Sequence, residues 1–122
     1  MQPDPIGVAV EALGDRWTLL ILRDVIFDDR RYFRALLNGS AEGIASNILA
    51  DRLVKLVEAG ILARGTALRG QRARYSLTEA GIRAVPVILA LGRWGSESFA
   101  VDDAHLIDEL RERHLGHADR TS

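Results

Sequence analysis

The sequence contains no cysteine among its 122 residues. This absence excludes disulfide bonds, thiolate nucleophiles and metal sites that have cysteine ligands. Long apolar runs are also missing, because none approaches the roughly 18 residues that a membrane-spanning helix needs. The first residues, Met1 to Asp4, form neither a basic leader nor an apolar signal region. We therefore expect a single cytoplasmic domain that has no membrane segment.

Motifs that would indicate catalysis or nucleotide binding are missing as well. No serine lies in a nucleophile-elbow sequence, and no glycine-rich phosphate loop follows a predicted strand. His105, His114 and His117 lie near the C-terminus, but no cysteine or well-placed carboxylate completes a tetrahedral set of metal ligands. The sequence therefore predicts no enzymatic activity, no metal site and no cofactor.

The formal net charge is −1, which argues against a nucleic-acid-binding protein. The charge is unevenly distributed, however. Residues 59–78 contain no acidic residue and four arginines, namely Arg64, Arg69, Arg72 and Arg74. Residues 96–122 contain seven acidic residues and three arginines. Because phosphate groups respond to a local basic patch rather than to the total charge, this distribution suits a protein with one DNA-binding face and a remote acidic face.

The stretch from Ile44 to Gly60 has the pattern of an amphipathic helix. Its apolar residues recur at spacings of three and four, at Leu49, Leu53 and Leu56. We expect Ser46, or Ala45 one residue earlier, to open the helix, because a serine oxygen can accept from the unpaired amides of the first turn. Gly60 is expected to end it, since glycine adopts a left-handed conformation without strain.

The next stretch has the pattern of a β-hairpin. Arg69-Gly70-Gln71 predicts its turn. In the following strand one side carries Ala73, Tyr75 and Leu77, and the other carries Arg72, Arg74 and Ser76. A helix followed by an arginine-rich hairpin predicts the recognition helix and wing of a winged helix-turn-helix. The expected fold is therefore mainly α with a small β-hairpin.

Five segments resemble the HxlR family of bacterial transcriptional regulators. They are residues 14–23 (GDRWTLLILR), 49–53 (LADRL), 58–62 (EAGIL), 75–81 (YSLTEAG) and 93–95 (RWG). The first and fourth segments are specific in combination, and the resemblance extends from about Pro5 to Gly95. It implies a dimeric winged-helix DNA-binding protein without catalytic activity.

Two further helices are expected before the recognition helix. The first spans residues 17–27 and has an inner stripe of Trp17, Leu20, Ile21 and Val25. The second spans residues 30–37 and would be the first helix of the helix-turn-helix. Its arginines either contact the sugar-phosphate backbone or form a solvated face balanced by Asp28 and Asp29; they are Arg30, Arg31 and Arg34.

Surplus apolar residues at both ends of the chain predict a homodimer. Residues 5–14 form a nearly all-apolar helix, and such a helix must be buried. A later helix begins at the Thr78 cap, contains Pro86, where a bend is expected, and ends at Gly95-Ser96; a last helix spans residues 102–115. We therefore expect a DNA-binding core at about residues 17–78 and dimerisation helices at about residues 5–14 and 79–115. The expected interface residues are Ile6, Val10, Leu13, Val87, Leu91 and Trp94.

The candidate DNA contacts lie on the recognition helix and the wing. On the helix they are Ser46, Asn47, Ala50, Asp51, Arg52 and Lys55, and on the wing Arg69, Arg72 and Arg74. Asn47 can pair bidentately with adenine, or it forms a local capping bond instead. Ser46 is expected to cap the helix and touch phosphate, and Arg52 to bind either phosphate or an acidic side chain of its own subunit. The wing arginines hold phosphates or enter the minor groove, unless they only protect a solvated hairpin edge.

The sequence thus predicts a homodimer that binds double-stranded DNA at an inverted-repeat operator and regulates transcription, with repression favoured over activation. The alternative is a winged-helix module for protein–protein assembly, which would not need the charge on the wing. Several HxlR-family members respond to small molecules, and an effector of unknown identity would fit an apolar cavity between subunits. Family members that sense oxidants commonly use a cysteine followed by proline before the first helix. Asp4 and Pro5 occupy those positions here, so thiol-based switching is excluded.

Overall fold

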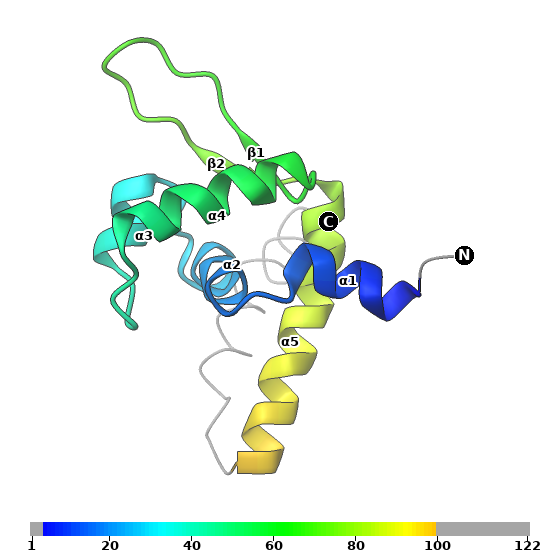
Figure 1. Ribbon diagram of the computed structural model, residues 1–122. Helices are drawn as coiled ribbons and strands as arrows, with labels where there is room; N and C mark the ends of the chain where they lie inside the picture. Colours follow the sequence, from blue (N-terminus) through cyan, green and yellow to red (C-terminus); the bar gives the residue numbers. More distant parts are fainter. Residues whose placement is uncertain (1–3, 100–122) are drawn as a thin grey trace, which may run out of the picture.

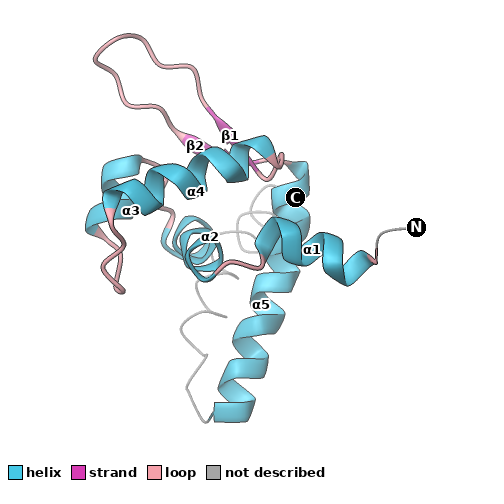
Figure 2. Cartoon of the chain, in the orientation of Figure 1, coloured by secondary structure: helices cyan, strands magenta, loops and turns pink. Residues whose placement is uncertain are grey.

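The computed structural model describes residues 4–99. Five helices and a two-stranded hairpin follow in the order α1 (Pro5–Leu13), α2 (Arg16–Asp28), α3 (Phe33–Asn38), α4 (Ser46–Glu58), β1 (Leu62–Arg64), β2 (Tyr75–Leu77) and α5 (Glu79–Phe99) (Figures 1 and 2). The hairpin loop extends beyond α4, whereas α1 and the distal part of α5 lie on the side away from the wing (Figure 1). The predicted mainly α fold with a small hairpin is confirmed.

Helix α2 lies at the centre of the core. It contacts α3, α4 and α5, and its Leu22, Val25 and Ile26 have exposed fractions of 0%. Helix α4 contributes the predicted stripe of Leu49, Leu53 and Leu56, which is buried. The predicted inner stripe of α2 is confirmed for Ile21 and Val25, which are buried, and Trp17 is half-buried and packs against the core; Leu20 is only half-buried. A helix packed on several sides buries more than one stripe, so a single period of apolar residues does not describe it.

The ends of α4 differ in how well they were predicted. At its C-terminus the amide of Gly60 donates to the carbonyl of Val57 and the amide of Ile61 to that of Leu56, both at 3.0 Å. Gly60 has a φ of 76°, as this closing motif requires. At the N-terminus the second of the two expected residues, Ala45, is the capping residue; the cap expected from the Ser46 hydroxyl was wrong, because no side chain caps the helix. Ser46 is instead the first helical residue, so its side chain is past the capping position.

The wing is an antiparallel pair in which Leu62 faces Leu77 and Arg64 faces Tyr75. Beyond the ladder, the amide of Gly65 donates to the carbonyl of Arg74 at 2.7 Å. The turn lies where it was predicted, since the amide of Gln71 donates to the carbonyl of Leu68 at 2.9 Å and Gly70 has a φ of 85°. That conformation favours glycine at the third position of a turn.

The junction between α4 and α5 is closed by Thr78. Its hydroxyl accepts from the amide of Gly81 at 3.1 Å, which confirms the predicted cap of α5. The same hydroxyl donates to the carbonyl of Ile61 at 3.0 Å, and the amide of Thr78 donates to that carbonyl at 3.1 Å. A Cβ at residue 81 would collide with this carbonyl oxygen, so only glycine permits the close approach. The start of α5 is therefore fixed to the residues that follow α4.

Two predicted helix boundaries were wrong. Helix α3 begins at Phe33, so Arg30 and Arg31 precede it. Helix α5 does not end at Gly95-Ser96 but continues to Phe99. A glycine inside a helix costs about 1 kcal/mol relative to alanine, which packing can offset, so it is a poor stop signal alone. The T-shaped contact between the rings of Trp94 and Phe99, with centroids 5.5 Å apart, spans this region.

Two expected features of the C-terminal part of the chain stay predictions. Helix α5 contains Pro86 within its length, and the bend expected there stays a prediction. The helix predicted over residues 102–115 lies outside the described residues. Within residues 4–99, no helix has the length and apolar character that crossing a membrane would require.

Candidate nucleic-acid interface

The outer face of α4 carries most of the candidate base contacts. Ser46, Asn47, Ala50, Asp51 and Val54 are all exposed, while the opposite side of the helix is buried against α2 and α3. These residues follow one another at spacings of one, three and four, so they share one side of the helix. The helix therefore presents a continuous surface of the width that a major groove admits.

The charged residues of this helix are largely paired with one another. Asp51 Oδ2 accepts from Arg52 Nη1 at 2.8 Å and lies 3.2 Å from Lys55 Nζ. Hydrogen bonds from Lys55 and Arg52 lower the pKa of Asp51. The two cations and the carboxylate thus form one ion-pair cluster on the flank of the helix.

Arg52 also connects the recognition helix to the start of α2. Its Nε donates to Asp15 Oδ2 at 2.8 Å and its Nη2 to Asp15 Oδ1 at 3.2 Å. Asp15 additionally accepts from the amide of Thr18 at 3.0 Å and caps α2. The hydrogen bond from Arg52 is the largest cause that lowers the pKa of Asp15 to about 2. Of the two roles expected for Arg52, the structure places it in the ion pair within its own subunit.

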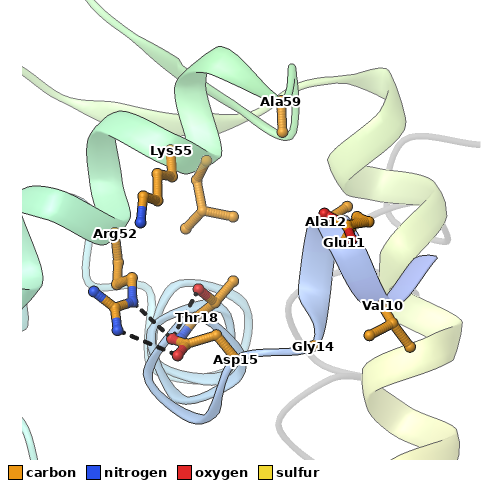
Figure 3. A pocket seen from close by; sticks show the side chains of 10 residues that line it. Val10, Glu11, Ala12, Gly14, Asp15, Thr18, Arg52, Lys55 and Ala59 are labelled. Carbon is orange, nitrogen blue, oxygen red and sulfur yellow. Dashed lines mark hydrogen bonds and ion pairs between the residues drawn. The ribbon is translucent and has the colours of Figure 1, made fainter. Parts of the chain in front are cut away.

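The ion pair lies at one wall of a cleft of about 310 Å³ between α1, the start of α2 and α4. Figure 3 shows the Arg52 side chain pointing from α4 to Asp15, with Lys55 on the same helix and Val10 on α1 across the cleft. Glu11 of α1 and Ala59, which follows α4, also line the cleft. Arg52 and Lys55 therefore face an opening between the recognition helix and the N-terminal helix, not only the outer surface.

The four wing arginines divide into two groups. Arg72 lies over the ring of Tyr32, with its guanidinium carbon 4.8 Å from the ring centroid. Arg64, Arg69 and Arg74 are exposed, and within residues 4–99 none of them has an ion pair. Tyr32 directly follows Arg31, and the carbonyl of Arg31 accepts a 2.7 Å hydrogen bond from the amide of Tyr75. Arg72 is exposed as well and has no ion pair within residues 4–99, so it differs from the other three arginines only in its contact with Tyr32, and all four contribute positive charge to the wing.

The arginines around α3 differ from one another in the same way. Arg30 Nη1 lies 3.1 Å from Asp28 Oδ2, and Arg31 Nε lies 2.7 Å from Asp29 Oδ1. These two follow the alternative in which aspartates balance them. Arg34 is exposed and has no ion pair among the described residues.

An ion-pair network under the helix-turn-helix loop was not foreseen from the sequence. Arg23 on α2 donates to both carboxylate oxygens of Glu42, each at 2.8 Å, and its Nε donates to Asp24 at 3.0 Å. Asp24 is buried, and this burial raises its pKa. Glu42 precedes α4, where the Ser40 hydroxyl also accepts from the amide of Ile44 at 3.0 Å. The network fixes the loop that leads into the recognition helix. In the sequence, the local indication of this network was Glu42, an acidic residue in a glycine-rich connection.

A second surface feature is an apolar groove between α1, α5 and the side of α2. Its volume is about 490 Å³, and it is lined by Pro5, Ile6, Ala9, Val10, Leu13, Gly14, Leu19, Val87 and Leu91. No residue of α1 is buried, and Ile6 has an exposed fraction of 73%. Five of the six residues expected in a dimer interface thus line one groove. Trp94 lies further along α5 and is 62% exposed.

A comparison of the chain with known sequences identifies its family. The sequence model of the family described as HxlR-like helix-turn-helix matches residues 12–103. The chain belongs to this family. The HxlR-like chain is 38% identical over 118 residues to HTH-type transcriptional regulators of Mycobacterium bovis and Mycobacterium tuberculosis, covering 95% of this chain and 72% of each relative.

Solved structures agree with this assignment. The crystal structure of a candidate transcription factor is 33% identical to the HxlR-like chain and superimposes with a TM-score of 0.73, covering 84% of this chain and 70% of that one. The reduced form of the transcriptional regulator YodB from Bacillus subtilis is 25% identical, with a TM-score of 0.62 and coverage of 80% and 94%. The HxlR-like chain is therefore a helix-turn-helix transcriptional regulator. Within the described residues, no group of acidic or histidine side chains could hold a metal ion.

Proposed function

We propose that the chain acts as a homodimer that binds an inverted-repeat operator through α4 and the wing. The observation that carries this proposal is the combination of an exposed, ion-balanced outer face on α4 with four exposed arginines on the adjacent wing that have no ion pair within residues 4–99. The face can enter a major groove and the arginines can hold the neighbouring phosphates. Asn47 is the expected base-reading residue, because its carboxamide is exposed near the start of α4.

The apolar groove supports the dimer part of the proposal. Val87 and Leu91 are each 47% exposed and lie one helical turn apart on α5, beside Ile6 and Val10 of α1. Burying this surface against a second copy removes apolar area from water, at about 25 cal/mol per Å². Such a dimer would present its two recognition helices to half-sites about 34–36 Å apart.

We favour repression over activation. Repression requires only that the dimer occupy a promoter, whereas activation also requires a surface that contacts the transcription machinery. The competing hypothesis, a winged-helix module for protein–protein assembly, gives no reason for a wing with four exposed arginines and no acidic residue.

The test combines DNA binding and mass. The full chain is titrated into the DNA upstream of its own gene and into a random duplex of equal length, and light scattering measures its mass at micromolar concentration. A dimer that prefers the upstream fragment supports the proposal. Equal affinity for both duplexes refutes sequence specificity, and a monomer refutes the dimer. The absence of any DNA binding would favour the assembly module.

A further inference from the structure

Val54 is an apolar side chain in an unusual place. It is 56% exposed on α4, and it is the one exposed large apolar residue of that helix within the described chain. The other exposed large apolar residues lie on α1, α5 or the wing loop. Val54 therefore belongs to neither the core nor the apolar groove. It shares the outer side of α4 with Ala50, four residues before it, and with Asn47, seven residues before it.

The neighbouring charges limit which bases this part of α4 can read. Guanine presents acceptors that suit a cation, and cytosine presents an amino group that suits a carboxylate. Asp51 is engaged by both Lys55 and Arg52, and Arg52 is engaged by Asp15 as well. The charge of Asp51 is therefore already balanced by two cations and that of Arg52 by two carboxylates, which weakens the attraction of either group for a base. The apolar side chains remain available without any rearrangement.

We infer that Val54, with Ala50 beside it, contacts the 5-methyl group of a thymine in the major groove and so selects thymine at one position of each half-site. Thymine is the base that presents a methyl group in that groove, and apolar side chains are its usual partners. This inference rests on the proposed function, since it requires α4 to lie in the major groove.

The geometry also gives an approximate position for this thymine. Val54 follows Asn47 by seven residues, which is roughly 10 Å along a helix that rises 1.5 Å per residue. At a spacing of 3.4 Å per base pair along one strand, the thymine would lie about three base pairs from the base that Asn47 reads.

The experiment first selects preferred sequences from a random duplex library with the full-length protein. Each thymine of the selected half-site is then replaced by deoxyuridine, which lacks only the 5-methyl group. Affinities are measured for the wild type, for Val54→Ala and for Val8→Ala. Val8 is a matched control, because it is an exposed valine of α1 that does not line the apolar groove. Circular dichroism verifies that the variants are folded.

We expect one thymine per half-site at which deoxyuridine weakens wild-type binding by about fourfold, as the loss of one buried methyl group implies. In Val54→Ala the same replacement should have a clearly smaller effect, because only Ala50 still contacts the methyl group, whereas Val8→Ala should behave as the wild type. A selected sequence in which every deoxyuridine is neutral would overturn the inference and leave the proposed function intact. An equal deoxyuridine effect in Val54→Ala would also overturn it, because another residue would then make the contact. Recovery of no preferred sequence would overturn the proposed function itself.

Discussion

Replacing Arg74 by alanine should weaken DNA binding in a strongly salt-dependent way. Arg74 is exposed at the base of the wing and has no ion pair among residues 4–99, so its charge is free to bind phosphate. Each phosphate contact contributes about −0.9 to the slope of log K against log salt concentration. A dimer loses two contacts, so the slope should become shallower by about 1.8. Between 50 and 200 mM salt the wild type should therefore lose roughly tenfold more affinity than the variant.

Arg72→Ala is the matched comparison, because it removes an arginine two residues before Arg74 that lies over the ring of Tyr32. An exposed cation–π contact contributes about 0.5–1 kcal/mol, so this change should mainly lower the free energy of unfolding by that amount. Its effect on the salt slope should be smaller than that of Arg74→Ala.

Fluorescence anisotropy with a preferred and a random duplex, at four salt concentrations, measures the slopes, and urea denaturation measures stability. Affinity should fall on both duplexes alike, since phosphate contacts are independent of sequence. An unchanged slope for Arg74→Ala at full affinity would refute the reasoning and leave this arginine as a solvated edge residue. A larger slope change for Arg72→Ala would show that the contact with Tyr32 does not occupy that guanidinium.

Three further outcomes are expected. Asn47→Ala should reduce discrimination at one base pair by about 1–3 kcal/mol and leave binding to random DNA nearly unchanged in competition titrations; equal losses on both would refute base reading by Asn47. Leu91→Asp should convert the dimer to a monomer in light scattering, because it places a charge in the apolar groove, and Ile82→Asp, outside that groove, should not. Asp15→Asn should keep the α2 cap but lose the ion pair with Arg52, at a cost of about 0.5 kcal/mol at pH 7, since Asp15 is half-exposed. Because the folded pKa is lowered from 3.8 to about 2, this stabilisation is complete above pH 3.8 and is lost as the pH falls through about 2. Urea denaturation of both proteins at several pH values should show the difference shrinking over that window, and a constant difference would contradict the assignment.

The features that the sequence predicted correctly depend on residues close together in the chain. The stripe of Leu49, Leu53 and Leu56, the glycine at residue 60 and the Thr78 cap each follow from spacing or from one side chain and its nearest amides. Such local patterns need no knowledge of the tertiary fold.

The features that it missed depend on contacts between distant residues. Arg52 and Asp15 are separated by 37 positions, and Arg23 and Glu42 by 19. Many carboxylates in this chain could have been their partners, and only packing determines which ones meet. The same holds for Arg72, whose position over Tyr32 separates it from arginines that look equivalent in the sequence. The extension of α5 past Gly95 likewise reflects an environment that residue propensity alone does not contain.

The closure around Thr78 has a mechanical consequence. The hydroxyl of Thr78 bonds both to the carbonyl of Ile61 after α4 and to the amide of Gly81 in α5. The backbone of Gly81 also lies close against that carbonyl. We therefore expect α4 and the start of α5 to move together as one rigid unit. Helix α5 has 21 residues, so it extends over roughly 30 Å from its junction with α4, and Pro86, where a bend is expected, lies about one third of the way along it. A tilt of a few degrees in the part of α5 before Pro86 would tilt α4 by the same angle. In the proposed dimer, the contacts that hold α5 would therefore set the angle at which the two recognition helices approach DNA.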